Sequence, residues 1–161
     1  MDQEILSKEI SSGLLALQQS LENHEEVRQT VDEQIVDLRR RTEHEKREEK
    51  LRVLKRALAS VFAQAIETGF ARLEQNDSKQ AREYFQLSCE ADPDSVWALS
   101  NLAVAKAMDG DRKGAFEALR TAKAKTKNPE RFDEWLKEEP AFTKLRGTPE
   151  FNSLLENSAQ H

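Results

Sequence analysis

Residues 109–116 read DGDRKGAF, and a looser copy, QNDSKQAREY, occupies residues 75–84. The two stretches place Asp77 and Asp111 at a separation of 34 residues. An asparagine precedes the first aspartate and a glycine precedes the second, and both residue types can adopt the left-handed backbone conformation that ends a helix. The spacing therefore predicts helical hairpins that recur every 34 residues.

Small residues recur at the same interval when residues 62–95 are laid over residues 96–129. Pro93 would end the second helix of the first unit, and Asp94 or Ser95 would cap the helix that follows. Small side chains let the axes of two helices approach closely where the helices of one hairpin touch, and four small residues stand at equivalent places. They are Gly69, Ala81, Ala103 and Ala115.

A helix–turn–helix period of 34 residues with small residues at these positions resembles the tetratricopeptide repeat (TPR). The resemblance covers residues 62–129 and implies a short TPR-like α-α superhelix of two repeats within residues 57–129. It also implies a concave groove, lined by the first helix of each repeat, that binds a protein or peptide. The residues expected to line this groove are Ile66, Phe70, Leu73, Trp97, Asn101, Val104 and Met108.

Trp97 is the candidate anchor for a partner, because a large flat side chain loses little rotamer entropy when it is covered. The alternative is that Trp97 packs against the preceding helix, and the sequence leaves both interpretations open. Trp135 is expected in the core of a C-terminal cap. That cap would span residues 130–161, with short helices that begin near Pro129, Pro140 and Pro149.

The N-terminal section carries a different period. Apolar residues step by three and four along residues 14–38, which is the 3.5-residue spacing of a coiled coil. A charged layer in the middle either fixes the register of the coil or lies exposed on a weakly paired helix. The seam consists of Leu14, Leu17, Leu21, His24, Arg28, Val31, Ile35 and Leu38.

Residues 39–50, RRRTEHEKREEK, contain no apolar side chain. Oppositely charged neighbours four residues apart, such as Arg39 with Glu43 and Glu48 with Arg52, favour a solvated helical shaft. We therefore expect residues 1–56 to form a coiled-coil helix that continues into the first repeat. Its seam predicts a homo-oligomer, and a dimer is favoured.

The charge distribution suggests a direction for this pairing. Residues 1–38 carry nine acidic and two basic residues, whereas residues 39–56 carry nine basic and four acidic residues. Two antiparallel chains, or one chain folded back near residue 39, would bring the opposite charges together. The charges therefore favour an antiparallel arrangement.

Nothing in the sequence indicates chemistry. Cys89 lies among apolar neighbours, far in sequence from each histidine, so we expect a buried thiol without a catalytic role. No phosphate-binding loop, paired histidine motif or nucleophile elbow occurs, and we expect no enzyme activity, cofactor or metal. The net charge of −5 argues against nucleic acid as the main partner. The opening MDQEILSKEI and the lack of a long apolar run predict a cytoplasmic protein without a membrane span.

The sequence thus predicts an all-α, non-catalytic scaffold for protein–protein interaction, with an N-terminal coiled-coil helix, two TPR-like hairpins and C-terminal capping helices. One alternative is an oligomerisation or docking segment of a larger polypeptide, with its groove filled intramolecularly. A more distant alternative is an adaptor that contacts RNA or a membrane surface through residues 39–56.

Overall fold

The computed structural model describes residue 7, residues 24–45 and residues 47–156. These ranges contain helices and no strand, which confirms the predicted all-α class for this part of the chain. Among the described helices, none has both the length and the apolar character of a transmembrane segment. The helices are α2 (His24–His44), α3 (Glu48–Glu74), α4 (Ser78–Ala91), α5 (Val96–Met108), α6 (Arg112–Lys125), α7 (Pro129–Glu138), the 3-10 helix η1 (Pro140–Phe142) and α8 (Pro149–Glu156).

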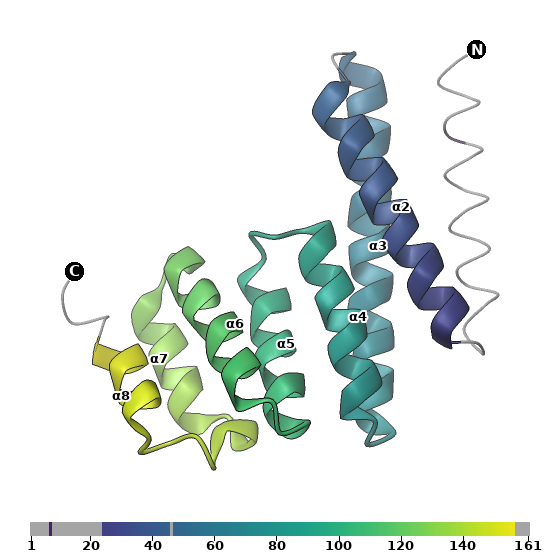
Figure 1. Ribbon diagram of the computed structural model, residues 1–161. Helices are drawn as coiled ribbons and strands as arrows, with labels where there is room; N and C mark the ends of the chain where they lie inside the picture. The colour runs from purple at the N-terminus through teal and green to yellow at the C-terminus, as the bar shows by residue number, and fades with distance from the viewer. Residues whose placement is uncertain (1–6, 8–23, 46, 157–161) are drawn as a thin grey trace.

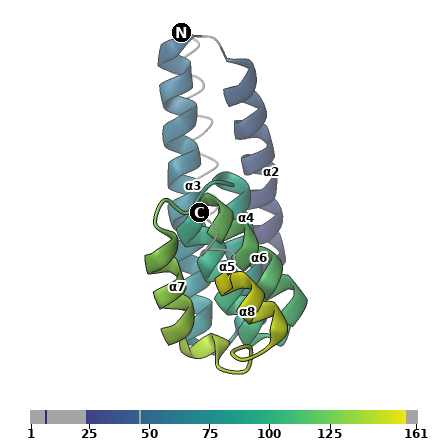
Figure 2. The ribbon, with the colours of Figure 1, turned by 90° about the vertical axis from the view of Figure 1, so that its left-hand side faces the viewer.

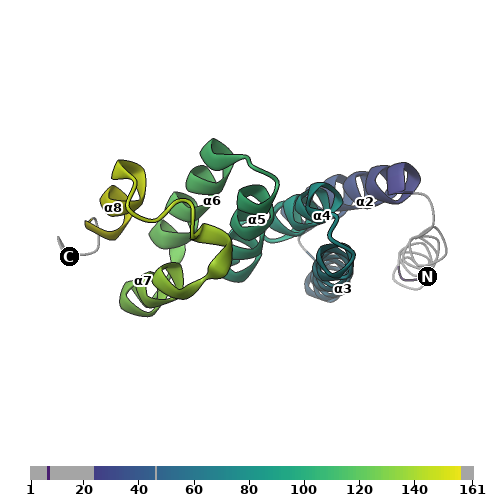
Figure 3. The ribbon, with the colours of Figure 1, turned by 90° about the horizontal axis from the view of Figure 1, so that it is seen from below.

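Successive helices run antiparallel and stack into a row (Figure 1). The most extensive contacts join α3 to α4, α4 to α5 and α5 to α6. Seen from below, α4 and α6 lie along one side of the row and α3 and α7 along the other (Figure 3). The upper ends of α2 and α3 project beyond the other helices, as Figure 2 shows from the side.

The two predicted turns have the same backbone geometry. Asn76 and Gly110 both take positive φ angles, 59° and 81°. The next residues, Asp77 and Asp111, each donate their backbone N–H to the carbonyl five positions earlier, at 2.9 and 2.8 Å. This is the hydrogen bond that a left-handed residue makes possible at the end of a helix. The recurrence predicted from sequence is therefore present in the backbone.

The same two aspartates start the helices that follow. The Asp77 carboxylate accepts the backbone N–H of Gln80 at 3.0 Å, and the Asp111 carboxylate accepts that of Gly114 at 2.9 Å. Each bond satisfies one of the N–H groups that a helix start leaves unpaired. Ser95 caps α5 in the same way, as predicted.

The four predicted small residues lie in the interior. Ala81, Ala103 and Ala115 are completely buried, and Gly69 faces the ring of Phe85. A Cβ added at Gly69 would lie 2.5 Å from that ring, so a larger residue would force the Phe85 ring to shift. Glycine therefore leaves room for the Phe85 ring at this contact between α3 and α4.

The C-terminal helices begin where the prolines predict. Phe142 of η1 is buried, and α8 buries Phe151 and Leu154. Trp135 of α7 is partly buried, with its ring centroid 5.4 Å from Phe132 and 5.3 Å from Phe142. Its aromatic contacts agree with the predicted place in the core of the C-terminal cap.

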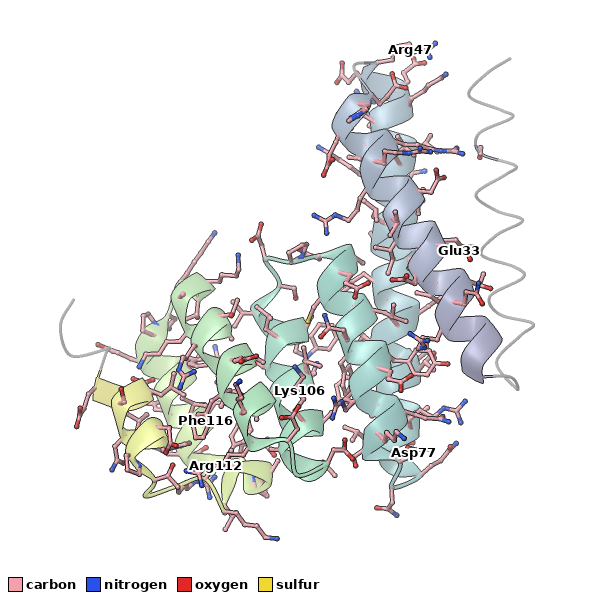
Figure 4. All side chains as sticks on the ribbon, viewed as in Figure 1. Glu33, Arg47, Asp77, Lys106, Arg112 and Phe116 are labelled. Carbon is pink, nitrogen blue, oxygen red and sulfur yellow. The ribbon has the colours of Figure 1, made fainter. Side chains whose placement is uncertain are left out.

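The predicted continuous N-terminal helix is wrong. The helix α2 ends at His44 and α3 begins at Glu48, and the chain reverses so that the two pack against each other. Figure 4 shows Arg47 at the tip of this hairpin. At the reversal the Glu45 carboxylate accepts the backbone N–H of Arg47 at 2.8 Å, and this bond lowers the pKa of Glu45.

Because of this hairpin, the described part of the seam packs within its own chain and not against a second chain. Val31, Ile35 and Leu38 are buried in one apolar cluster with α3 and α4 of the same chain, so these three positions cannot pair two chains as predicted. Leu54 and Val61 contribute to the cluster from α3. The reversal is favourable because it lets the stripes of α2 and α3 cover each other. Outside the described residues lie Leu14, Leu17, Leu21 and the side chain of His24.

Arg28 is exposed, which is one of the two alternatives predicted for the charged layer of the seam. Its side chain is 45% exposed and lies 3.5 Å from the carboxylate of Glu83 on α4. In the shaft, the predicted pair of Glu48 and Arg52 forms at 2.8 Å. Arg39 instead donates to the backbone carbonyl of Glu90 at 2.9 Å, which ties α2 to α4.

The predicted domain boundary between residues 56 and 57 falls inside α3. This one helix contacts both α2 and α4, since its Leu54, Val61 and Ala65 share a cluster with Tyr84 and Leu87. The N-terminal arm and the first hairpin are therefore joined by a continuous helix.

Candidate functional site

An aromatic surface joins α3 to α5. We use this name for Phe62, Phe70 and Trp97. The Trp97 ring centroid lies 6.3 Å from that of Phe62 and 6.2 Å from that of Phe70. Trp97 is 55% exposed and Phe70 is 38% exposed, so the rings contact one another and still face solvent.

The helices behind the rings hold them in place. The ring of Phe85 on α4 is completely buried and meets Phe70 edge to face, with centroids 5.3 Å apart. Phe85 in turn occupies the space left by Gly69. The close contact of α3 with α4 thus supports one ring of the surface from below.

On α5, four predicted groove residues lie on one face because their spacings are four, three and four. The two at the ends are exposed, Trp97 by 55% and Met108 by 50%. Val104 is partly buried against the core, and Asn101 is partly buried. The amide nitrogen of Asn101 makes no hydrogen bond with any group of the described chain.

On α3 the prediction needs a correction. Ile66 is only 4% exposed and belongs to the main core, so it cannot line an open groove. Leu73 also packs partly against this core. Phe62 was not predicted, although it lies one helical turn before Ile66 and two turns before Phe70.

Trp97 packs against an earlier helix only in part. Its ring contacts Phe62 and Phe70 of α3, and more than half of its surface remains exposed. The role of Trp97 as an anchor for a partner stays a prediction.

A second feature is a charged cavity of about 240 Å³ between α2, α4 and α5. Figure 4 shows Lys106 of α5, which contributes to its wall. Residues of both charge signs line it, with one leucine. They are Arg28, Asp32, Arg82, Glu83, Gln86, Leu87, Glu90 and Lys106.

Glu90 is the residue lining this cavity whose pKa is shifted. Burial raises its pKa, and the neighbouring carboxyl group of Asp32 raises it further through a hydrogen bond and charge repulsion. Gln86 and Arg39 act in the opposite direction. A negative charge close by disfavours the ionised form of a carboxyl group. The protonated form of Glu90 is therefore favoured at the contact between α2 and α4.

Cys89 is buried in the main core, and burial raises its pKa to about 12. At neutral pH the sulfur is a thiol, which is a poor nucleophile. This agrees with the predicted buried thiol.

The residues that the structure describes contain no group of three histidine, cysteine or acidic side chains placed to hold a metal ion. A scan against protein-family models and searches of curated proteins and of solved structures find no match to this chain.

Proposed function

We propose that this chain is a non-catalytic scaffold whose aromatic surface binds a peptide or a segment of another protein. The observation that carries the proposal is the exposure of Trp97, which is 55% uncovered beside two other rings. Covering such a ring removes apolar area from water at a small cost in rotamer entropy, and tryptophan is enriched at the centres of interfaces for this reason.

The rigidity of the support favours this function. Phe85 and Ala81 behind the surface are completely buried, and Gly69 leaves room for the Phe85 ring. A surface that is already ordered before binding loses less conformational entropy on association. The aromatic surface can therefore bind without rearrangement of the helices that carry it.

We also propose that the two hairpins are TPR-like repeats. The proposal is supported by the 34-residue period, by the matching positive φ angles of Asn76 and Gly110, and by the matching caps of Asp77 and Asp111. In such an array the first helices of the hairpins form the binding side. Here those helices are α3 and α5, which carry the aromatic surface.

Pairing of chains is proposed for the first part of the seam alone. Leu14, Leu17 and Leu21 continue the spacing of the buried Val31 and Ile35. We expect a dimer that light scattering detects for the full chain, and a monomer when the three leucines are replaced by lysine. A full-length chain that is already monomeric would contradict this part of the proposal.

A displayed library of random peptides tests the binding proposal without knowledge of the natural partner. Wild-type protein is expected to enrich peptides that Trp97→Ala does not retain. Trp135→Phe serves as the control, because that ring packs within the C-terminal cap. Equal enrichment on wild type and Trp97→Ala, or none on the wild type, would contradict the proposal.

A further inference from the structure

The aromatic surface continues into a basic patch along α3. We use this name for Arg52, Lys55 and Arg56, which are all exposed. Lys55 lies seven residues before Phe62, and residues at spacings of three, four and seven share a face of a helix. At 1.5 Å per residue, Lys55 and Phe62 are about 10 Å apart along the axis.

Two charges of this patch are uncompensated within the described chain. Arg52 pairs with Glu48 at 2.8 Å. Lys55 and Arg56 make no ion pair with any described residue. Both are exposed and lie in the first third of α3, seven and six residues before Phe62.

Acidic side chains border the other part of the surface, around Phe70. Glu67 and Glu74 are exposed and lie three residues before and four residues after Phe70 on α3. Both are helical neighbours of that ring. The surface therefore has a basic end at Lys55 and Arg56. Its acidic residues lie beside Phe70, with Glu67 between the two phenylalanines and Glu74 near the turn that ends α3.

We propose that this surface binds an acidic, apolar segment of a partner protein in one orientation. Aromatic or aliphatic side chains of the segment cover Trp97 and Phe70, and its carboxylates lie at the end that meets Lys55 and Arg56. The inference rests on the proposed function and adds to it the charge and direction of the ligand.

Single-stranded nucleic acid is the competing ligand, since bases stack on exposed rings and phosphates bind basic residues. Every nucleotide carries a phosphate, so stacking on Phe70 would bring negative charge beside Glu67 and Glu74. A peptide can confine its carboxylates to the other end. The acidic border of the surface therefore favours a protein segment.

The peptides enriched by wild type over Trp97→Ala provide the probes. We expect them to combine apolar residues with a cluster of Asp or Glu at one end. Lys55→Glu/Arg56→Glu should weaken their binding, measured by fluorescence anisotropy, by at least about tenfold, and the loss should shrink as salt rises. Lys79→Glu/Lys113→Glu makes the same change in net charge at exposed positions on α4 and α6, and should change binding less than about twofold.

The outcomes separate the two proposals. Enriched peptides that are neutral or basic, or that bind equally well to the charge-reversed variant, would overturn this inference and leave the proposed function standing. Failure to enrich any peptide would overturn both. A 20-nucleotide single-stranded RNA serves as a competitor, and its displacement of the peptides through Lys55 and Arg56 would assign the surface to nucleic acid instead. Circular dichroism and urea unfolding confirm that each variant is folded.

Discussion

The α2–α3 arm and the two hairpins built from α3 to α6 both bury regular apolar stripes. The helix that covers each stripe is determined differently in the two regions. In the hairpins, Asn76 and Gly110 end one helix and the next aspartate starts another, so the partner of each helix is its neighbour in sequence. In the arm, the stripe from Val31 to Leu38 carries no such local signal. The spacing of apolar residues thus indicates which face of a helix is buried. The residues of the turns indicate which helix packs against that face.

The largest effect should come from the interior of the first hairpin. Phe85→Ala removes a completely buried ring and is expected to cost about 3–5 kcal/mol of the free energy of unfolding in urea. Leu119 occupies the equivalent place 34 residues later and is also completely buried, so Leu119→Ala should cost about 2–5 kcal/mol. A cost below about 1 kcal/mol for both would contradict the equivalence of the hairpins.

A matched pair in α2 tests the arm. Ile35 is 1% exposed and its neighbour Val36 is 61% exposed. Ile35→Ala should cost about 2–5 kcal/mol, because it opens a cavity between α2 and α3, and Val36→Ala should stay within about 0.5 kcal/mol. Similar costs for the two variants would show that α2 does not bury this face.

The turns allow a finer comparison. Gly110→Ala places a Cβ at a φ of 81° and should lower the free energy of unfolding by about 1–2 kcal/mol. Asn76→Gly should change it by less than about 0.5 kcal/mol, since asparagine already tolerates this conformation. Thermal unfolding that shows no loss for Gly110→Ala would contradict the shared turn geometry.

The smallest effect concerns pH at the contact of α2 with α4. The folded-state pKa of Glu90 is raised, so its contribution to stability is fully present below its unfolded pKa near 4.5 and is lost as pH rises through the folded value. Glu90→Gln should therefore be more stable than wild type at pH 7 and equal to it near pH 4. The difference between the two urea midpoints across this range measures the effect, with the exposed Glu117→Gln as control. If the difference in urea midpoint between wild type and Glu90→Gln is the same at pH 4 and pH 7, the raised pKa of Glu90 is not its cause.

The sequence predicted the later helices well because their ends carry local chemistry. Ser95, Asp111 and Asn128 each accept a backbone N–H at the start of a helix, and these bonds depend on a few adjacent residues. The burial of Ala81 and Ala115 followed from the same repeat. Short-range patterns were sufficient for these elements.

The reversal between α2 and α3 was not predictable from such patterns. Residues 39–50 contain good helix formers and neither glycine nor proline, so local preference favours a continuous helix. The reversal depends on burial of Ile35 and Leu38 against residues from Leu54 onward, which is a long-range gain. Charge alone had indicated that one chain could fold back near residue 39.

The candidate site was predicted in part for a similar reason. The exposed face of α5 follows directly from the spacing of Trp97 and Met108. On α3 the same reasoning failed for Ile66, because this helix is covered on one side by α2 and α4 and on another by the main core. Phe62 lies one helical turn before Ile66, ahead of the stretch that was predicted to line the groove.

The reversal of the arm within one chain can be measured directly by electron spin resonance. Spin labels at Glu33→Cys and Ala59→Cys, both exposed positions, are introduced in a Cys89→Ala background and diluted into unlabelled protein to suppress contacts between chains. An antiparallel hairpin places the two backbones about 10 Å apart, so the labels should report a distance of about 10–25 Å. A distance near 39 Å, roughly the length of about 26 residues of continuous helix, would contradict the account.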